Sequence, residues 1–246
     1  MTDEILDRNR DAWNARRYES WVTALGTPEQ EARVLAADPA YKLRRLLPHM
    51  GDVAGRRVCN VQGSHGRIAV ALALIGADAT VIDFAEENRR YALELAAAAG
   101  VTIDYRLADA MAADALGLAP FDWVAMELGI LHYHRDLTGF FVVMARLAKP
   151  GGRLIVHEFH PVNRKLRQTG HPPDYFNAKI MIGDVPNPTG DGTRLGQCAF
   201  RAWTLGEIVT AAVDAGWAIE KLLEHPDWVD EPTWPGTFTL LAAKPA

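Results

Sequence analysis

The sequence contains little of what would point to several common protein classes. Its 246 residues include only two cysteines, Cys59 and Cys198, which lie far apart and form neither a CxxC motif nor a Cys/His metal spacing. No apolar run reaches the ~18 residues that span a bilayer, and the charged N-terminal segment lacks the apolar core of a signal peptide. We therefore expect a cytosolic protein without a metal site or a membrane partner.

Basic runs are also missing. The net charge is -5, and no cluster of Lys and Arg offers a surface for nucleic acid. What is present is ordinary globular composition, with 49% hydrophobic and 23% charged residues and no internal repeat. This composition and length fit one large domain, or one domain with an appendage.

The pattern of apolar residues indicates an α/β protein. Before any strand, helices are expected at residues 4–22, 29–37 and 40–49. Strands then alternate with helices, which predicts a parallel sheet covered on both faces. The predicted strands are 57–61, 79–83, 102–106, 121–127 and 153–159, and the predicted helices are 66–76, 86–99 and 137–147.

The C-terminal third differs in character. Residues 161–202 are rich in Pro, Gly and Asn, and such a long excursion is unusual in a compact domain. Strands are expected there at 178–185 and 193–203. A helix at 204–215 and strands at 217–224 and 237–243 close the chain. We expect the excursion to cap a substrate or to form an oligomer contact, such as that of a homodimer.

The stretch 58-VCNVQGSHGRIA-69 reads as a strand, a turn and the start of a helix. A glycine-rich turn here lets the backbone approach a ligand, and the amides of the helix N-terminus can bind a carboxylate. A G-x-G-x-G pattern would place glycines at Gln62, Ser64 and Gly66, but only Gly66 fits, and Gly63 is out of phase. The turn is short and polar, yet it departs from the usual spacing.

Three more motifs follow in order. Asp83 ends the strand in 80-TVIDF-84, 20 residues beyond Gly63, a spacing at which a carboxylate can accept hydrogen bonds from ribose hydroxyls. The others are 107-LADAM-111 and the pair 121-FDWVAMELGILHYHRD-136 and 149-KPGGRLIVHEF-159. The simpler interpretation of Asp83 alone is a helix N-cap.

Taken together, these motifs resemble the class I S-adenosylmethionine (SAM)-dependent methyltransferases, over about residues 55–160 and the closing helix and strands. The resemblance implies a doubly wound, seven-stranded, mostly parallel sheet with an antiparallel last strand. It also implies an N-terminal helical lid (1–50) and a SAM-binding domain (51–246) with a β-hairpin insertion (161–202). A branch of small-molecule methyltransferases has Gln at the position of Gln62.

The resemblance also implies which residues of this chain contact the cofactor. Asp83 would bind both ribose oxygens, Asp109 would lie near the adenine amino group, and Ala110 or Met111 would pack on the ring. The full set of implied cofactor-binding residues is Asn60, Gln62, Gly63, Ser64, Gly66, Asp83, Phe84, Asp109, Ala110, Met111, Glu127 and Leu128. The product would be S-adenosylhomocysteine (SAH).

Methyl transfer is an in-line displacement, so alignment comes first and a base is needed only when the acceptor loses a proton. Ligands of such sheets lie beyond the carboxyl ends of the strands. The catalytic candidates there are His160, Glu158 and His132, with His134 and His157 nearby in sequence. The alternative is that these histidines only hydrogen-bond backbone. A metal site from residues 157–160 is disfavoured because adjacent strand residues point apart.

Aromatic and polar side chains supply candidates for an acceptor pocket: Trp13, Tyr18, His132, His160, Tyr175 and Trp203. For the N-terminal aromatics, including Trp21, core packing is the competing interpretation. The leading hypothesis is methyl transfer to an N or O nucleophile of a small-molecule metabolite. The alternatives are a catalytically silent module that binds SAM or a nucleotide, and an NAD(P) dehydrogenase, which the closing strands disfavour.

Overall fold

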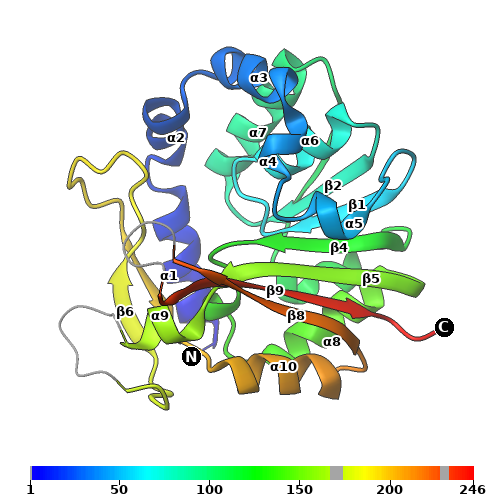
Figure 1. The fold of residues 1–246 in the computed structure, drawn as a ribbon. Coiled ribbons are helices and arrows are strands. Elements are labelled where there is room, and N and C mark those ends of the chain that lie inside the picture. Colours follow the sequence, from blue (N-terminus) through cyan, green and yellow to red (C-terminus); the bar gives the residue numbers. More distant parts are fainter. Residues whose placement is uncertain (1, 167–173, 228–232) are drawn as a thin grey trace. The chain divides into compact units, whose positions relative to one another are not determined.

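The computed structural model describes residues 2–166, 174–227 and 233–246 (Figure 1). Its main sheet has seven strands in the order β3-β2-β1-β4-β5-β9-β8. Strand β9 pairs antiparallel with β5 and β8, and the pairs β1–β2, β2–β3 and β4–β5 are parallel. The predicted α/β fold with a seven-stranded, mostly parallel sheet and an antiparallel last strand is therefore confirmed.

The chain divides into two compact units that differ from the predicted boundary at residue 50. The first unit contains residues 1–113 and 182–199, and the second contains 114–181 and 200–246. The expected lid segment thus groups with the first three strands and with part of the 161–202 insertion. The split into a lid and a SAM-binding domain stays a prediction.

The first unit is built on the parallel strands β1 (Arg57–Val61), β2 (Asp78–Asp83) and β3 (Asp104–Leu107). The residues of β1 and β2 are almost all buried, as their apolar runs predict. Helix α6 (Arg67–Leu74) packs on β2, and α7 (Glu86–Ala98) packs on β3 (Figure 1). Helix α3 (Pro28–Ala37) begins with a capping box between Thr27 and Gln30. It packs on helices α6 and α7.

Two of the expected N-terminal helices are broken. The predicted helix 4–22 is two helices, α1 (Thr2–Asn14) and α2 (Arg17–Leu25), because Arg16 takes a left-handed conformation with φ 53°. The predicted helix 40–49 is also two short helices, α4 (Pro39–Lys42) and α5 (Leu47–Met50). Pro48 explains the second break, because proline fits the first turn of a helix and not its interior.

The second unit contains β4 (Phe121–Glu127), β5 (Ala148–Phe159), β8 (Ala218–Pro226) and β9 (Pro235–Ala243). Helices α8 (Leu137–Leu147) and α10 (Leu205–Asp214) pack against each other and against these strands (Figure 1). Strand β5 is followed directly by α9 (Pro161–Leu166), a helix that the sequence pattern did not predict. Pro161 favours a helix that begins at this residue, because proline fits the first position of a helix.

The insertion forms a two-stranded sheet of β6 (Met181–Asp184) and β7 (Gln197–Phe200), shorter than the predicted strands 178–185 and 193–203. The Asn9 side chain completes this sheet, since it donates to the Ala199 carbonyl (3.1 Å) and accepts from the Ala199 amide (2.8 Å). Arg17 Nη1 also donates to the Pro186 carbonyl at 2.9 Å. These contacts bind α1 and α2 to the insertion within the first unit.

Candidate functional site

The turn between β1 and α6 keeps the backbone form that glycines adopt. Gln62 and Ser64 both have φ 49°, and Gly66, at the start of α6, has φ 75°. A left-handed conformation costs a non-glycine residue about 1–2 kcal/mol. Such strain persists where the surrounding structure requires it, and it gathers at binding sites. The turn therefore has Gln62 and Ser64 at positions of the glycine pattern, and both keep the backbone conformation that glycine favours.

Backbone and side-chain hydrogen bonds fix this turn to the neighbouring strands. The Gln62 amide donates to the Ile82 carbonyl at 2.6 Å. The Ser64 amide donates to Asp83 Oδ2 at 3.0 Å, and the Tyr105 hydroxyl donates to the Ser64 carbonyl at 3.0 Å. The ends of β1, β2 and β3 thus hold the turn in one conformation.

Asp83 lies at the end of β2 with 7% of its surface exposed. Its carboxylate accepts from the amides of Ser64 and Ala85, at 3.0 and 2.9 Å. Burial raises the pKa of this carboxyl, and the hydrogen bonds from Ala85, Ser64 and Asn88 oppose that shift. Asp83 is more than an N-cap, because it also positions the turn.

The two glycines that remain in the turn are required for packing. A Cβ on Gly63 would lie 2.5 Å from Asn60 Oδ1, and one on Gly66 would lie 2.6 Å from the Ala92 Cβ. Gly66 lets α6 approach α7 closely, and Gly63 leaves room for the buried Asn60 side chain. The glycines thus serve the close packing of the fold here.

The N-terminal helices touch the same turn. The Trp21 ring packs edge-on against the His65 ring, with centroids 4.3 Å apart, and Trp21 Nε1 donates to Asn88 Oδ1 at 2.8 Å. Burial lowers the pKa of His65 well below its usual value, so this imidazole is neutral at pH 7. Trp21, interpreted from sequence as core packing, is therefore part of the wall around the turn.

In the second unit, Glu158 holds the loop that follows β4. Its carboxylate oxygens accept from the amides of Gly129 (2.7 Å), Ile130 (2.7 Å) and Leu131 (3.2 Å), and from that of Phe159 (2.7 Å). A carboxylate that accepts four N–H groups has its acceptor sites filled. The geometry favours a positioning role for Glu158 over the predicted role of base.

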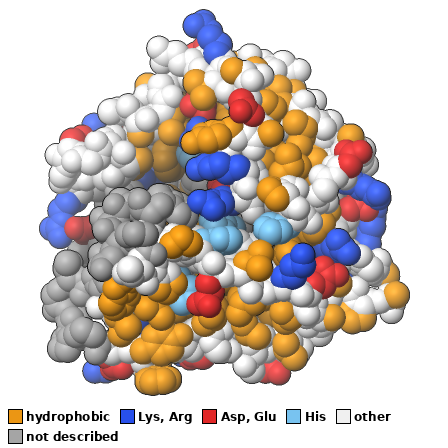
Figure 2. All heavy atoms as spheres, in the orientation of Figure 1, with side chains coloured by type: hydrophobic (Ala, Val, Ile, Leu, Met, Phe, Trp, Pro, Cys, Tyr) orange, Lys and Arg blue, Asp and Glu red, His pale blue; other side chains and the backbone are white. Residues whose placement is uncertain are grey.

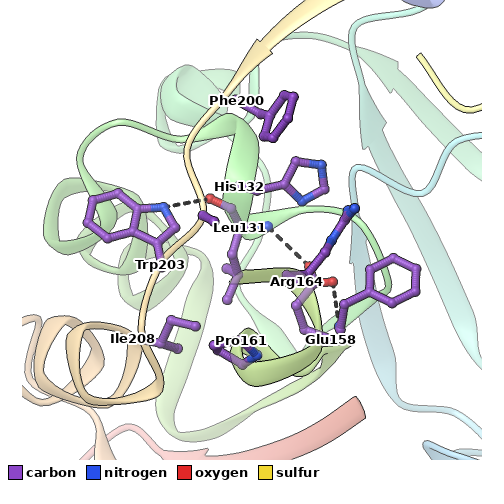
Figure 3. A pocket seen from close by; sticks show the side chains of 10 residues that line it. Leu131, His132, Glu158, Pro161, Arg164, Phe200, Trp203 and Ile208 are labelled. Carbon is purple, nitrogen blue, oxygen red and sulfur yellow. Dashed lines mark hydrogen bonds between the residues drawn. The ribbon is translucent and has the colours of Figure 1, made fainter. Parts of the chain in front are cut away.

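A pocket lies between this loop and the start of α10. It offers about 410 Å³ of space, part of it open to solvent (Figure 3). Trp203 forms one wall, and its Nε1 donates to the carbonyls of Leu131 (3.1 Å) and His134 (3.2 Å). The lining residues are Leu131, His132, Glu158, Phe159, Pro161, Arg164, Phe200, Ala202, Trp203 and Ile208.

His132 is the titratable ring in this lining. Burial, with the nearby charge of Arg164, lowers the pKa of His132 well below its usual value. The ring lies 4.1 Å from that of Tyr133 and 6.0 Å from that of Phe200, centroid to centroid. A neutral imidazole in an aromatic pocket can accept a proton from a bound hydroxyl.

Comparison with known proteins agrees with the fold. The model of a family described as a methyltransferase domain matches residues 60–156. The ubiquinone biosynthesis O-methyltransferase of Methylococcus capsulatus is 31% identical over 191 residues, which cover 77% of this chain and 75% of the relative. The chain belongs to the class I SAM-dependent methyltransferases. A relative of the same name from Caulobacter sp. is 32% identical over 156 residues, which cover 63% of this chain and 60% of the relative.

Solved structures show the same fold for this methyltransferase. A SAM-dependent methyltransferase from Mesorhizobium loti has a TM-score of 0.63 at 22% identity, and covers 85% of this chain and 99% of its own. The magnesium protoporphyrin IX methyltransferase of Synechocystis PCC 6803, solved with bound SAH, has a TM-score of 0.60 at 17% identity. The match covers 96% of this chain and 97% of that protein. SAM is the cofactor of the family.

The residues around the turn fit such a cofactor. Ser64 Oγ and His65 Nδ1 are buried, and neither has a hydrogen-bond partner among the residues that the structure describes. Buried polar atoms usually have partners, so these two are suited to the polar methionine end of SAM. The Asp83 carboxylate beside them is suited to the ribose hydroxyls.

Other predicted cofactor residues have structural partners here, and their cofactor role stays a prediction. Asp109 Oδ1 accepts from the Met111 amide at 3.0 Å and so starts the short 3-10 helix η1 (Ala110–Leu116), in which Ala110 is buried. Phe84 is half-buried directly after β2. Glu127 ends β4 in the second unit, and Leu128 follows with φ 54°.

Several predicted catalytic or substrate residues lie outside the pocket lining. His160 is 2% exposed, and both its ring nitrogens are engaged, with Glu224 Oε1 at 2.7 Å and with the Val162 amide at 3.1 Å. The geometry thus favours a structural role for His160. The Tyr175 hydroxyl accepts from the Leu205 amide at 3.0 Å and so supports the start of α10.

The predicted aromatic residues of the first unit have charged neighbours. The Arg17 guanidinium carbon lies 4.2 Å from the centroid of the Trp13 ring, and that of Arg90 lies 3.9 Å from the centroid of Tyr18. The Tyr18 hydroxyl also donates to Glu94, and this hydrogen bond raises the pKa of Tyr18 to about 12. A substrate role for Trp13 and Tyr18 stays a prediction.

Within the described part of the chain, no group of three or more His, Cys, Asp or Glu side chains is placed to hold a metal ion. No helix there is long and apolar enough to cross a membrane. On the face drawn in Figure 2, acidic and basic side chains are interspersed with each other and with hydrophobic ones. Among the residues that Figure 2 colours by type, no large patch of a single charge sign, such as attracts nucleic acid, is visible.

Proposed function

We propose that this methyltransferase transfers the methyl group of SAM to an N or O nucleophile on a small aromatic metabolite. The observation that carries the proposal is the second unit's pocket, where Phe159, Phe200 and Trp203 surround a neutral His132. Aromatic walls with few polar groups are typical of small-molecule sites. The names of the relatives, which are O-methyltransferases, favour a hydroxyl as the acceptor.

When bound, SAM would supply an electrophilic methyl group on its sulfonium, and SAH would be the leaving group. The protein's part is to hold the acceptor and to remove its proton. The aromatic side chains orient a flat ring and exclude water, and His132 accepts the proton of the attacking hydroxyl. Because its pKa is lowered, His132 is unprotonated at neutral pH.

Glu158 prepares the site for this step. Its carboxylate fixes the amides of residues 129–131, which lead directly into His132. A base held by a rigid loop does not have to be ordered when the substrate binds. We infer that Glu158 acts by positioning and takes no proton.

The test is methyl transfer from isotope-labelled SAM to a panel of phenols, catechols and aromatic amines, with SAH formation as a second readout. We expect turnover with hydroxyl acceptors. His132→Gln should lower kcat by about 100-fold or more, the usual contribution of a general base, and should leave SAH affinity unchanged. His49→Gln, on α5 outside the pocket lining, is the control.

Two outcomes would contradict the proposal. An unchanged kcat in His132→Gln would remove this residue as the base. SAH binding without turnover of any acceptor would favour the silent binding module.

A further inference from the structure

We propose that the acceptor carries a carboxylate, which Arg164 binds in the second unit's pocket. This inference rests on the proposed function and names the substrate class more closely, as a hydroxylated aromatic acid. Arg164 would then be a specificity-determining residue, and the aromatic walls would hold the ring to which the carboxylate is attached.

The position of Arg164 is the first observation. It lies on α9, half-buried in the pocket lining, with its guanidinium carbon 4.7 Å from the centroid of the Phe159 ring. In Figure 3 its side chain points toward the His132 ring. The Arg164 charge contributes to the lowered pKa of His132, so the two groups interact electrostatically. A ligand bound to this guanidinium is therefore held beside the proposed base.

The second observation is that the Arg164 guanidinium has no side-chain acceptor among the residues that the structure describes. None of the carboxylates in the described ranges forms an ion pair or hydrogen bond with it. Glu158 lines the same pocket, but its oxygens already accept from four backbone amides. A guanidinium presents five N–H donors in a planar fork, and here they are directed at a ligand space.

Arg201 provides the contrast inside the same unit. Its guanidinium carbon also lies on an aromatic ring, 3.6 Å from the centroid of Trp203. Arg201, however, is paired with Glu207 at 2.5 Å and is not in the pocket lining. The chain therefore neutralises one stacked arginine and leaves the one that faces the pocket for another partner.

A planar carboxylate fits that partner best. It can bind the fork through two parallel hydrogen bonds, which are stronger than neutral ones and fix the direction of the ligand. The pocket is partly open to solvent, and aromatic side chains beside Arg164 offer faces on which a flat ring can pack. A carboxylate on Arg164 and a ring along Phe159 and Phe200 would bring a ring hydroxyl toward His132.

The test compares ligands that differ only in charge. We would titrate the protein, saturated with SAH, with hydroxybenzoic and dihydroxybenzoic acids and with the corresponding amides. The acids should bind about tenfold or more tightly than their amides, as expected for a charge-assisted bidentate contact. Arg164→Gln should abolish this preference, and Arg164→Lys should retain part of it.

The control is Arg146→Gln on α8, whose arginine is already paired with Asp114, and it should keep the full preference. A panel in which no acid binds better than its amide overturns the proposal, and so does a preference that survives Arg164→Gln. A loss of SAH affinity in Arg164→Gln would instead assign the arginine to the cofactor. If neutral phenols are methylated and acids are not bound, the proposed function stands and this inference fails.

Discussion

At the scale of single residues, Gln62 and Ser64 show how a binding turn survives the loss of its glycines. Both keep a left-handed backbone, held by hydrogen bonds from their amides to Ile82 and Asp83. The strain is a stability cost that glycine would avoid. A side chain retained at such a position is a candidate for direct contact with the ligand.

Gln62→Gly tests that idea. The substitution removes left-handed strain, so the free energy of unfolding should rise by up to about 1 kcal/mol, and SAH affinity should fall several-fold if the side chain contacts the cofactor. Arg16→Gly is the matched control, because Arg16 has the similar φ of 53° between α1 and α2. Urea unfolding and SAH titration give the two readouts. Equal SAH affinities for both variants and the native protein would deny the Gln62 side chain a cofactor contact.

Asp83 is predicted to bind the ribose. Asp83→Asn should weaken SAH binding by about 1.5–3 kcal/mol, because a charge-assisted hydrogen bond to a hydroxyl is lost. An SAH analogue without ribose hydroxyls separates this effect from a disturbed turn, since its weaker binding should not depend on the substitution. Asp78→Asn, at the other end of β2 and paired with Arg57, is the control. The same loss of affinity for SAH and for the analogue would speak for a purely structural role.

At the scale of elements, the sequence predicted the regular parts closely. Strands 57–61 and 121–127 and helix 137–147 have the bounds of β1, β4 and α8. These elements carry their own signals, namely buried apolar runs and a cap such as Asp136 before α8. The short β6 and β7 were predicted too long. Strand β7 also bonds to the Asn9 side chain, a contact distant in sequence that local patterns do not reveal.

The candidate site was predicted less completely than the fold. The turn after β1 and Asp83 follow from local spacing, and the structure brings them together. Arg164 and Phe200 belong to no motif, and only the folded second unit places them in one pocket. Glu158 was found in the sequence as an acid at a strand end, but its filled acceptor sites are visible only in the structure.

The loop after β4 should depend on Glu158 for its order. Glu158→Gln leaves a single acceptor oxygen and points an NH₂ group at backbone donors, so the free energy of unfolding should fall by about 2–3 kcal/mol. Urea unfolding measures the change. Glu220→Gln, which breaks a partly exposed pair with Arg153, should cost less than about 1 kcal/mol. A change for Glu158→Gln as small as that of Glu220→Gln would contradict the positioning role.

At the scale of the whole molecule, the chain's two compact units were not predicted. Residues 182–199 join the N-terminal half through contacts such as those of Gly196 with Ala12 and of Pro186 with Arg17. A Cβ on Gly196 would lie 2.9 Å from the Ala12 Cα, so this glycine permits the close approach. Long-range contacts of this kind leave no periodic signal, and for that reason composition suggested a separate insertion.

The acid stability of the molecule should reflect its buried histidines. Burial lowers the pKa of His134 to about 3, and it also lowers the pKa values of His65, His132 and His160. In the unfolded chain a histidine titrates near pH ~6.5. Below that pH each of these histidines binds a proton in the unfolded chain but stays unprotonated in the folded protein. The free energy of unfolding therefore falls as the pH falls.

The substitution His134→Phe measures the contribution of one of these histidines to the pH dependence of stability. His134 is buried and stacks on Phe140 with centroids 3.9 Å apart, an arrangement that phenylalanine can keep. Each such histidine lowers the free energy of unfolding by about 1.4 kcal/mol per pH unit below pH ~6.5. From pH 7 to pH 5 the variant should therefore gain about 2 kcal/mol relative to the native protein. Urea unfolding at both pH values measures this difference, and a difference that does not change with pH would show that His134 is protonated in the folded protein as readily as in the unfolded chain.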